Sequence, residues 1–240
     1  MCPSLDNSRH EREPVNDLQR GTLRSQVEVI LRNAILDGRY RAGQKLVERE
    51  LCELTGASRS ILREALVSLE ASGLIERESY RGYSVTLLSV GKIYEIFELR
   101  ATLETLAAEL FAERASDAEM AELEALLAGL EECVSSSDVP RIWRLKERYY
   151  ELLFRGCRNS EIRRALENII DRVHYLRSRL MSNPERRAKS LDEMRRLTTA
   201  LIARDRVETR AASLAHLAAA RDSLLEGMER AEPQTEESAA

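Results

Sequence analysis

The sequence is poor in glycine, proline and aromatic residues, and its cysteines are scattered. Ten glycines, five prolines and 5% aromatics in 240 residues favour a mostly helical chain with few strands. The four cysteines form no CxxC pair and the N-terminal segment is polar rather than a signal peptide, so we expect a cytoplasmic protein with reduced thiols. No apolar run approaches the length of a transmembrane helix, which argues against the membrane as a partner.

Motifs for catalysis are also missing. The chain has no GxSxG, no HExxH and no glycine-rich phosphate loop, and its three histidines are far apart in the sequence. We therefore predict that the protein is not an enzyme. The net charge of -4 at pH 7 argues against a uniformly basic surface, so any DNA binding has to come from a local basic face.

The sequence pattern divides the chain near residue 90. The length allows two domains that each bury a core, which we assign to residues 20–88 and 90–228. The flanking segments, 1–19 and the acidic 229–240, contain few large apolar residues and are expected to be disordered.

The first domain has the pattern of a winged helix-turn-helix. Apolar residues recur at helical spacing over 23–35, and two shorter helices are expected at 46–54 and from the N-cap Ser58 onward. The short TGAS connection between those two helices is typical of a helix-turn-helix. Two β-like runs then flank a turn at residues 80–82, which predicts a short β-hairpin wing.

Candidate DNA-contacting residues lie on the third helix and in the wing. Arg59, Ser60 and Arg63 project from the N-terminal end of the helix, the part that enters a major groove. An arginine there can donate to O6 and N7 of guanine or bind a phosphate, and a serine can bond either. Arg81 at the wing tip and Gly82, which permits close backbone approach, suit a minor groove or its phosphates. A single surface arginine is more often a solvated charge than a DNA contact, so the interpretation depends on their arrangement.

Two segments resemble a known family. LVERELCELTGASRSILREALVSLEASGLIERESYRGYSV is similar, almost without a gap, to the winged-helix signature of the GntR superfamily. Many members carry proline where this chain has Ile61, so the helix start is expected to differ. The segment YEIFELRATLETLAAELFAERAS resembles the first helix of the FCD effector domain, which defines the FadR-type branch. The first resemblance implies DNA contacts at Arg49, Arg59, Ser60, Arg63, Arg81 and Gly82.

The second domain shows helical patterns only, and we expect an all-α antiparallel bundle of about six helices. Ser, Asp, Asn and Pro residues between the patterns supply caps and turns. The resemblance implies that this domain holds the dimer contact and binds an effector between its helices. The expected helices cover residues 90–115, 117–134, 138–156, 160–182, 185–204 and 206–228.

Many FCD domains bind a divalent metal through an aspartate and three histidines. Here the corresponding positions are Lys146, Tyr150, Met194 and His216, of which only His216 is a usual metal ligand. We therefore predict no metal and no other cofactor. These four residues are instead candidates for holding a small organic effector, an organic anion among the options. The alternative for His216 is a histidine buried in a helix interface.

Two further residues are effector candidates with a structural alternative. Arg100 matches the arginine of the FCD first helix and can bind a carboxylate bidentately, or it can pair with Glu104 at helical spacing. His174 can face the effector cavity, or it packs like its neighbour Tyr175 and like Trp143.

These patterns predict a DNA-binding transcriptional regulator, with repression as the expected sign. It binds double-stranded, palindromic operator DNA as a homodimer and is modulated by a small-molecule effector in the helical domain. The alternative is a constitutive DNA-binding dimer whose helical domain only dimerises and senses no ligand.

Overall fold

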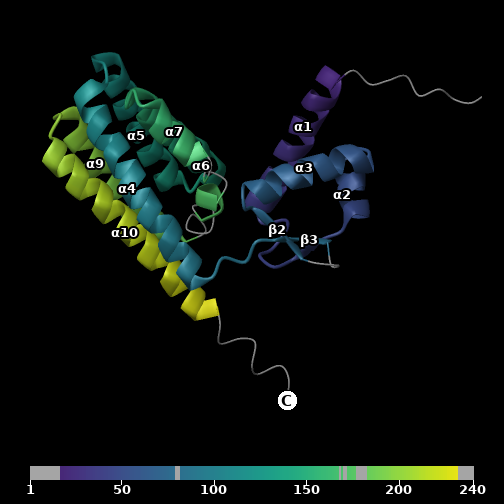
Figure 1. Ribbon diagram of the computed structural model, residues 1–240. Helices are drawn as coiled ribbons and strands as arrows, with labels where there is room; N and C mark the ends of the chain where they lie inside the picture. The colour runs from purple at the N-terminus through teal and green to yellow at the C-terminus, as the bar shows by residue number, and fades with distance from the viewer. Residues whose placement is uncertain (1–16, 79–81, 168, 170–171, 177–182, 232–240) are drawn as a thin grey trace, which may run out of the picture.

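The computed structural model describes residues 17–78, 82–167, 169, 172–176 and 183–231, as a helical N-terminal part with a small sheet and a helical bundle (Figure 1). A connection over residues 86–89 joins the two parts. The mostly helical fold class is confirmed. The expected disordered arm and tail lie largely outside the described residues, while the first helix begins at Asp17 and the last continues to Ala231.

The N-terminal part is a winged helix-turn-helix, as predicted. Its core combines apolar side chains from all three helices and from the sheet, including the buried Leu31, Leu51, Leu62 and Val85. The elements follow in the order α1 (Asp17–Leu36), β1 (Lys45–Leu46), α2 (Glu48–Thr55), α3 (Arg59–Ala71), β2 (Ile75–Glu78) and β3 (Gly82–Val85).

The turn between α2 and α3 follows from two local signals. Gly56 ends α2 in the left-handed region with φ of 67°, and its N–H donates to the Cys52 carbonyl at 2.8 Å. Ser58 caps α3 because its Oγ accepts the N–H of Ile61 at 3.5 Å. A proline at position 61 has no N–H and could not make this bond.

The sheet contains one strand that the sequence analysis did not anticipate. All pairs are antiparallel in the order β1-β3-β2, so β3 lies in the middle. Leu46 of β1 pairs with Tyr83, which pairs on its other side with Arg77 of β2. The two-residue β1 anchors the start of α2 to the wing.

The second part is a helical bundle with a continuous apolar core. Ser116 forms a capping box with Glu119 at the start of α5, while Asp138 caps α6 and Asn183 caps α9. These caps lie at the breaks expected from the sequence. The helices are α4 (Val90–Arg114), α5 (Asp117–Ser136), α6 (Val139–Gly156), α7 (Ser160–Glu167), α9 (Pro184–Ile202) and α10 (Arg206–Ala231).

The helix expected over 160–182 is not continuous, which corrects the sequence interpretation. α7 ends at Glu167, Ile169 lies in a turn, and a separate helical stretch covers 172–176. Ile162, Ile169 and Val173 are all buried in the bundle core, so the apolar period continued across the break and hid it. None of the described helices is long and apolar enough to cross a membrane.

Candidate nucleic-acid interface and candidate effector site

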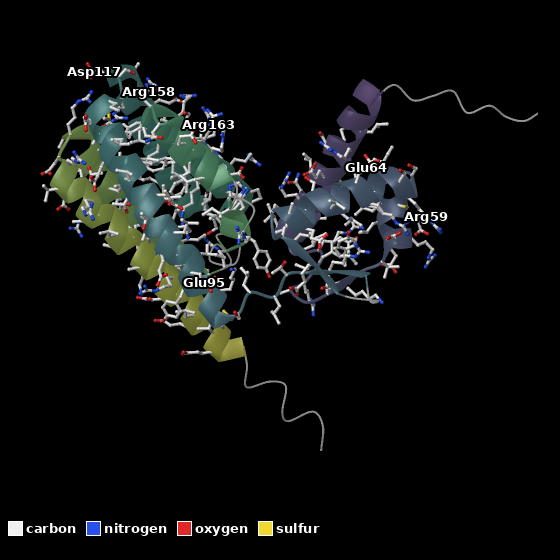
Figure 2. All side chains as sticks on the ribbon, in the orientation of Figure 1. Arg59, Glu64, Glu95, Asp117, Arg158 and Arg163 are labelled. Atoms are coloured by element: carbon white, nitrogen blue, oxygen red, sulfur yellow. The ribbon has the colours of Figure 1, made fainter. Side chains whose placement is uncertain are left out.

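The N-terminal end of α3 presents polar side chains to solvent. Arg59, Ser60 and Arg63 are all exposed, while Leu62 and Leu66 on the opposite face are fully buried. Figure 2 shows Arg59 extending away from the domain beside α2. Because the buried face is fixed in the core, the orientation of the exposed face is set by packing rather than by the arginines.

Two of the candidate arginines, Arg49 and Arg63, form ion pairs with glutamates. Arg49 is exposed on α2, where its NH1 donates to Glu53 Oε1 at 3.3 Å one turn later. Arg63 reaches across to the start of α2, where its Nε lies 3.1 and 3.2 Å from the two carboxylate oxygens of Glu48. The pKa of Arg63 is raised, first by the hydrogen bond to Glu48 and then by its charge.

Gly82, at the start of the second wing strand, has the positive φ that favours glycine. Gly82 begins β3 with φ of 89° and is exposed, and among the described residues none beyond its chain neighbours has an atom within 4 Å of the position that a Cβ would take. A phosphate backbone could therefore approach this position closely. Arg81 lies outside the described residues, so its predicted contact stays a prediction.

In the bundle, four of the predicted effector residues are buried on neighbouring helices. Lys146 and Tyr150 lie on α6, Met194 on α9 and His216 on α10. The Tyr150 hydroxyl lies 2.8 Å from His216 Nε2, and Lys146 Nζ donates to Ser190 Oγ at 2.6 Å. Tyr150 and His216 thus form one connected site.

The charge of this site is set by Glu193 and Arg186, two α9 residues that the sequence analysis missed. Arg186 donates two hydrogen bonds to Glu193, at 2.8 and 2.7 Å. His216 Nδ1 lies 2.7 Å from Glu193 Oε2. Burial raises the pKa of Glu193, but the hydrogen bonds from His216 and Arg186 outweigh it and the net pKa is lowered. The seven-residue spacing places Arg186 and Glu193 on one helix face, which was the available signal.

The tautomer of His216 follows from these partners. Burial is the largest cause that lowers its pKa, opposed by Glu193 and reinforced by the charges of Lys146 and Arg186. The neutral ring therefore donates from Nδ1 to the Glu193 carboxylate and accepts the Tyr150 hydroxyl proton at Nε2.

The contacts described for Arg100, a further predicted effector residue, lie within α4. Arg100 is fully buried, with Nε bonded to Glu104 Oε1 at 2.7 Å and its guanidinium 4.6 Å from the centre of the Phe97 ring. The ion pair expected as the alternative is therefore present, although NH1 of Arg100 is buried without a hydrogen-bond partner. A surface groove of about 410 Å³ between α9 and α10 contains none of the predicted effector residues.

His174 packs against α6. Its ring makes an edge contact with Trp143 at 5.4 Å between centroids, and its Nδ1 lies 3.5 Å from Glu147. The contact with Trp143 is the packing alternative.

The donor set around His216 does not fit a divalent metal. A lysine ammonium and a guanidinium repel a cation, and both nitrogens of His216 already have partners. Among the described residues, no group of three or more His, Cys, Asp or Glu side chains could hold a metal ion.

Comparison with known families gives the class of protein. Residues 23–85 match the bacterial regulatory proteins of the gntR family, and residues 95–219 match the FCD domain. These matches cover the winged helix-turn-helix and most of the bundle. The chain therefore belongs to the GntR family of transcriptional regulators, with a DNA-binding helix-turn-helix followed by an FCD domain. This family is not enzymatic, in agreement with the sequence analysis.

Curated relatives place the chain among regulators of several bacteria. It is 32% identical to the HTH-type transcriptional regulator YdhC of Bacillus subtilis over 168 residues, 70% of this chain and 75% of the relative. It is 29% identical to the Nta operon transcriptional regulator of Aminobacter aminovorans, over 78% of this chain and 87% of the relative. The HTH-type transcriptional repressor GlaR of Escherichia coli is also 29% identical, over 73% and 83%.

Solved structures share the fold. Escherichia coli McbR/YncC superposes with a TM-score of 0.75 at 22% identity, over 86% of this chain and 98% of the other. A Rhodococcus sp. RHA1 regulator of the GntR type gives 0.73 at 21% identity, over 85% and 98%.

Proposed function

We propose that this regulator is a homodimeric repressor that binds a palindromic operator through α3 and the wing, and that a small organic effector in the FCD domain changes its DNA affinity without a metal. The observation that carries the DNA-binding part is the exposed end of α3, where Arg59, Ser60 and Arg63 stand clear of a fixed core. Repression is supported by the relative named as a repressor.

Exposed apolar side chains support a dimer through the FCD domain. Leu99 and Leu106 on α4 are 42% and 38% exposed, and Leu214 on α10 is 39% exposed. α4 and α10 are antiparallel neighbours, joined by the buried hydrogen bond between Thr105 and Ser213 at 2.9 Å. A second copy covering these leucines would remove apolar surface from water. Sedimentation equilibrium tests this, because a dimer has twice the 27.3 kDa of one chain.

Contacts between the two parts offer a route from effector to DNA. Tyr175 packs against both hydrophobic cores. The side chain of Arg172 lies against Gly73, directly after α3, with Cδ 3.0 Å from where a Cβ of Gly73 would lie. The stretch 172–176 also contacts α6, which carries Lys146 and Tyr150, through His174 and Trp143. A shift of α6 on effector binding would therefore reach the end of α3.

DNA binding is tested with a duplex selected by the wild-type protein from a random-sequence library. Fluorescence anisotropy is expected to show weaker binding of that duplex by Arg59→Ala, on the order of tenfold for one lost arginine contact to a base. Arg141→Ala, an equally charged change on the exposed surface of the bundle, is the matched control. Equal loss in the control and in Arg59→Ala, or equal wild-type affinity for random DNA, would contradict the proposal.

One observation favours a second function, a constitutive DNA-binding dimer without a ligand. The Arg186, Glu193, His216 and Tyr150 side chains hydrogen-bond to one another without a ligand, although Nε of Arg186 is buried with no hydrogen-bond partner in the described structure. Thermal shift with sugar acids, dicarboxylates, amino acids and acyl compounds discriminates, because a ligand of the native state raises the melting temperature. The sensor is supported by a shift that Lys146→Met or Tyr150→Phe abolishes. Absence of any shift, with DNA affinity unchanged by the panel, supports the constitutive dimer.

A further inference from the structure

The Arg63 guanidinium is restrained by one edge only. Its Nε donates to the Glu48 carboxylate, with 3.1 and 3.2 Å to the two oxygens, while the side chain as a whole remains 65% exposed. In the part of the chain that the structure describes, its two terminal nitrogens donate no hydrogen bond. The terminal edge of the guanidinium, formed by its two terminal nitrogens, is therefore able to donate hydrogen bonds to a ligand from solvent.

Glu48 belongs to a rigid part of the domain. It lies in the first turn of α2, where the helix dipole favours a carboxylate. Leu46, two residues before Glu48, is buried and paired with Tyr83 in the sheet, and Leu51 in the next turn of α2 is fully buried. Burial is the first cause that raises the pKa of Tyr83 in the wing, and the charge of Glu48 adds to it. The backbone that carries the Glu48 carboxylate is therefore anchored by the sheet on one side and by the core on the other.

We propose that Glu48 is a positioning residue for sequence readout, which fixes Arg63 so that its terminal nitrogens meet O6 and N7 of a guanine in the half-site. With Nε committed to Glu48, only the terminal edge can make the bidentate contact that distinguishes guanine from other bases. Restraint before binding also reduces the side-chain entropy lost on the DNA. This inference rests on the proposed DNA-binding role of Arg63.

The Arg49–Glu53 pair shows why the Glu48 contact is different. Arg49 and Glu53 are both largely exposed, 73% and 64%, and belong to the same helix. Such a pair restrains neither side chain relative to the rest of the domain. The Glu48–Arg63 pair instead joins α2 to α3, fifteen residues apart in the sequence.

A purely electrostatic role for Glu48 predicts the opposite sign. A carboxylate beside a DNA-binding helix repels phosphates, so its removal would strengthen binding to every sequence. A positioning role predicts weaker binding to the selected duplex with binding to random DNA unchanged or stronger. The two roles are therefore separated by the ratio of the two dissociation constants.

The experiment measures this ratio for the full chain with Glu48→Ala, Glu48→Gln and Arg63→Ala, on the selected duplex and on random DNA. Each base pair of the half-site is then exchanged in turn, which gives a specificity profile for each variant. Glu50→Ala and Glu50→Gln are the matched controls, since Glu50 is an exposed acidic residue of the same helix turn. Thermal melting shows whether each variant is folded. If Glu48→Ala does not fold, the comparison is made with Glu48→Gln.

We expect Glu48→Ala to lose specificity on the order of tenfold, with the profile flattened at the same G·C pair that Arg63→Ala flattens. Glu48→Gln is expected to lose less, because its amide oxygen can still accept from Nε. The double variant Glu48→Ala/Arg63→Ala should be no worse than Arg63→Ala alone.

Three results would overturn the inference. Tighter binding of Glu48→Ala to both DNAs would show that Glu48 acts only by repelling phosphates. An equal loss of specificity in the Glu50 variants would show a non-specific charge effect. Flattening at a base pair that Arg63 does not read would separate the two residues. The underlying proposal fails separately, if Arg63→Ala itself binds the selected duplex as tightly as wild type.

Discussion

Replacing Glu193 by alanine is expected to destabilise the FCD bundle by about 3 kcal/mol. The change removes the acceptor of two hydrogen bonds from Arg186 and one from His216. The side chains left behind are only 4% and 7% exposed, so neither can regain its hydration without moving. Removing one partner of a buried ion pair costs about 3–5 kcal/mol, and the 21% exposure of Glu193 places this case at the lower end.

The assay uses the single tryptophan of the chain. Trp143 lies in α6 against His174, so its fluorescence during urea unfolding reports on the bundle. Glu208→Ala is the matched control, because Glu208 joins the same two helices through Arg196 at 2.7 Å while both side chains are about half exposed. We expect the control to change the free energy of unfolding little. If Glu193→Ala falls within about 0.5 kcal/mol of the control, the network does not stabilise the bundle as argued.

Two further predictions concern the same domain. Because burial lowers the pKa of His216, the unfolded chain takes up a proton below the ordinary value of 6.5 while the folded chain does not. The free energy of unfolding is therefore highest above that pH and falls on acidification. A second loss follows at lower pH, where Glu193, whose folded pKa is lowered, becomes protonated. In urea unfolding, the free energy of unfolding of His216→Gln should depend less on pH near pH 6 than that of the wild type. Gly156→Ala is expected to cost about 1–3 kcal/mol, since its Cβ would lie 2.5 Å from a ring atom of the buried Phe111. Gly227→Ala, in a helix with open space around it, should instead stabilise by up to about 1 kcal/mol, and a thermal melt in which both changes act alike would contradict this reasoning.

Much of the fold could be predicted because its signals are local. The αL turn at Gly56, the cap at Ser58 and the apolar stripe through Leu62 and Leu66 each depend on residues within a few positions of one another. The same holds for the break capped by Ser116. The exposed face of α3 follows from its buried face, so the candidate DNA-contacting residues could be identified too.

Two features of the fold escaped prediction because they depend on distant partners or on a period that continues across a break. The two-residue strand β1 exists only through its pairing with β3, almost forty residues later in the chain. The helical period over 160–182 continued past Glu167, where the helix itself ends. Neither the strand pairing nor the helix break can be recognised from a short window of sequence.

The sequence by itself determined the class of this protein, because the helix-turn-helix and the wing are specified by neighbouring residues. Only the tertiary structure decided the partners of the charged side chains that pair between different helices. Arg63 meets Glu48 across a helix junction, and His216 meets Glu193 and Tyr150 from three different helices. Such contacts depend on how whole helices pack against one another, so the conformational preferences of single residues do not predict them.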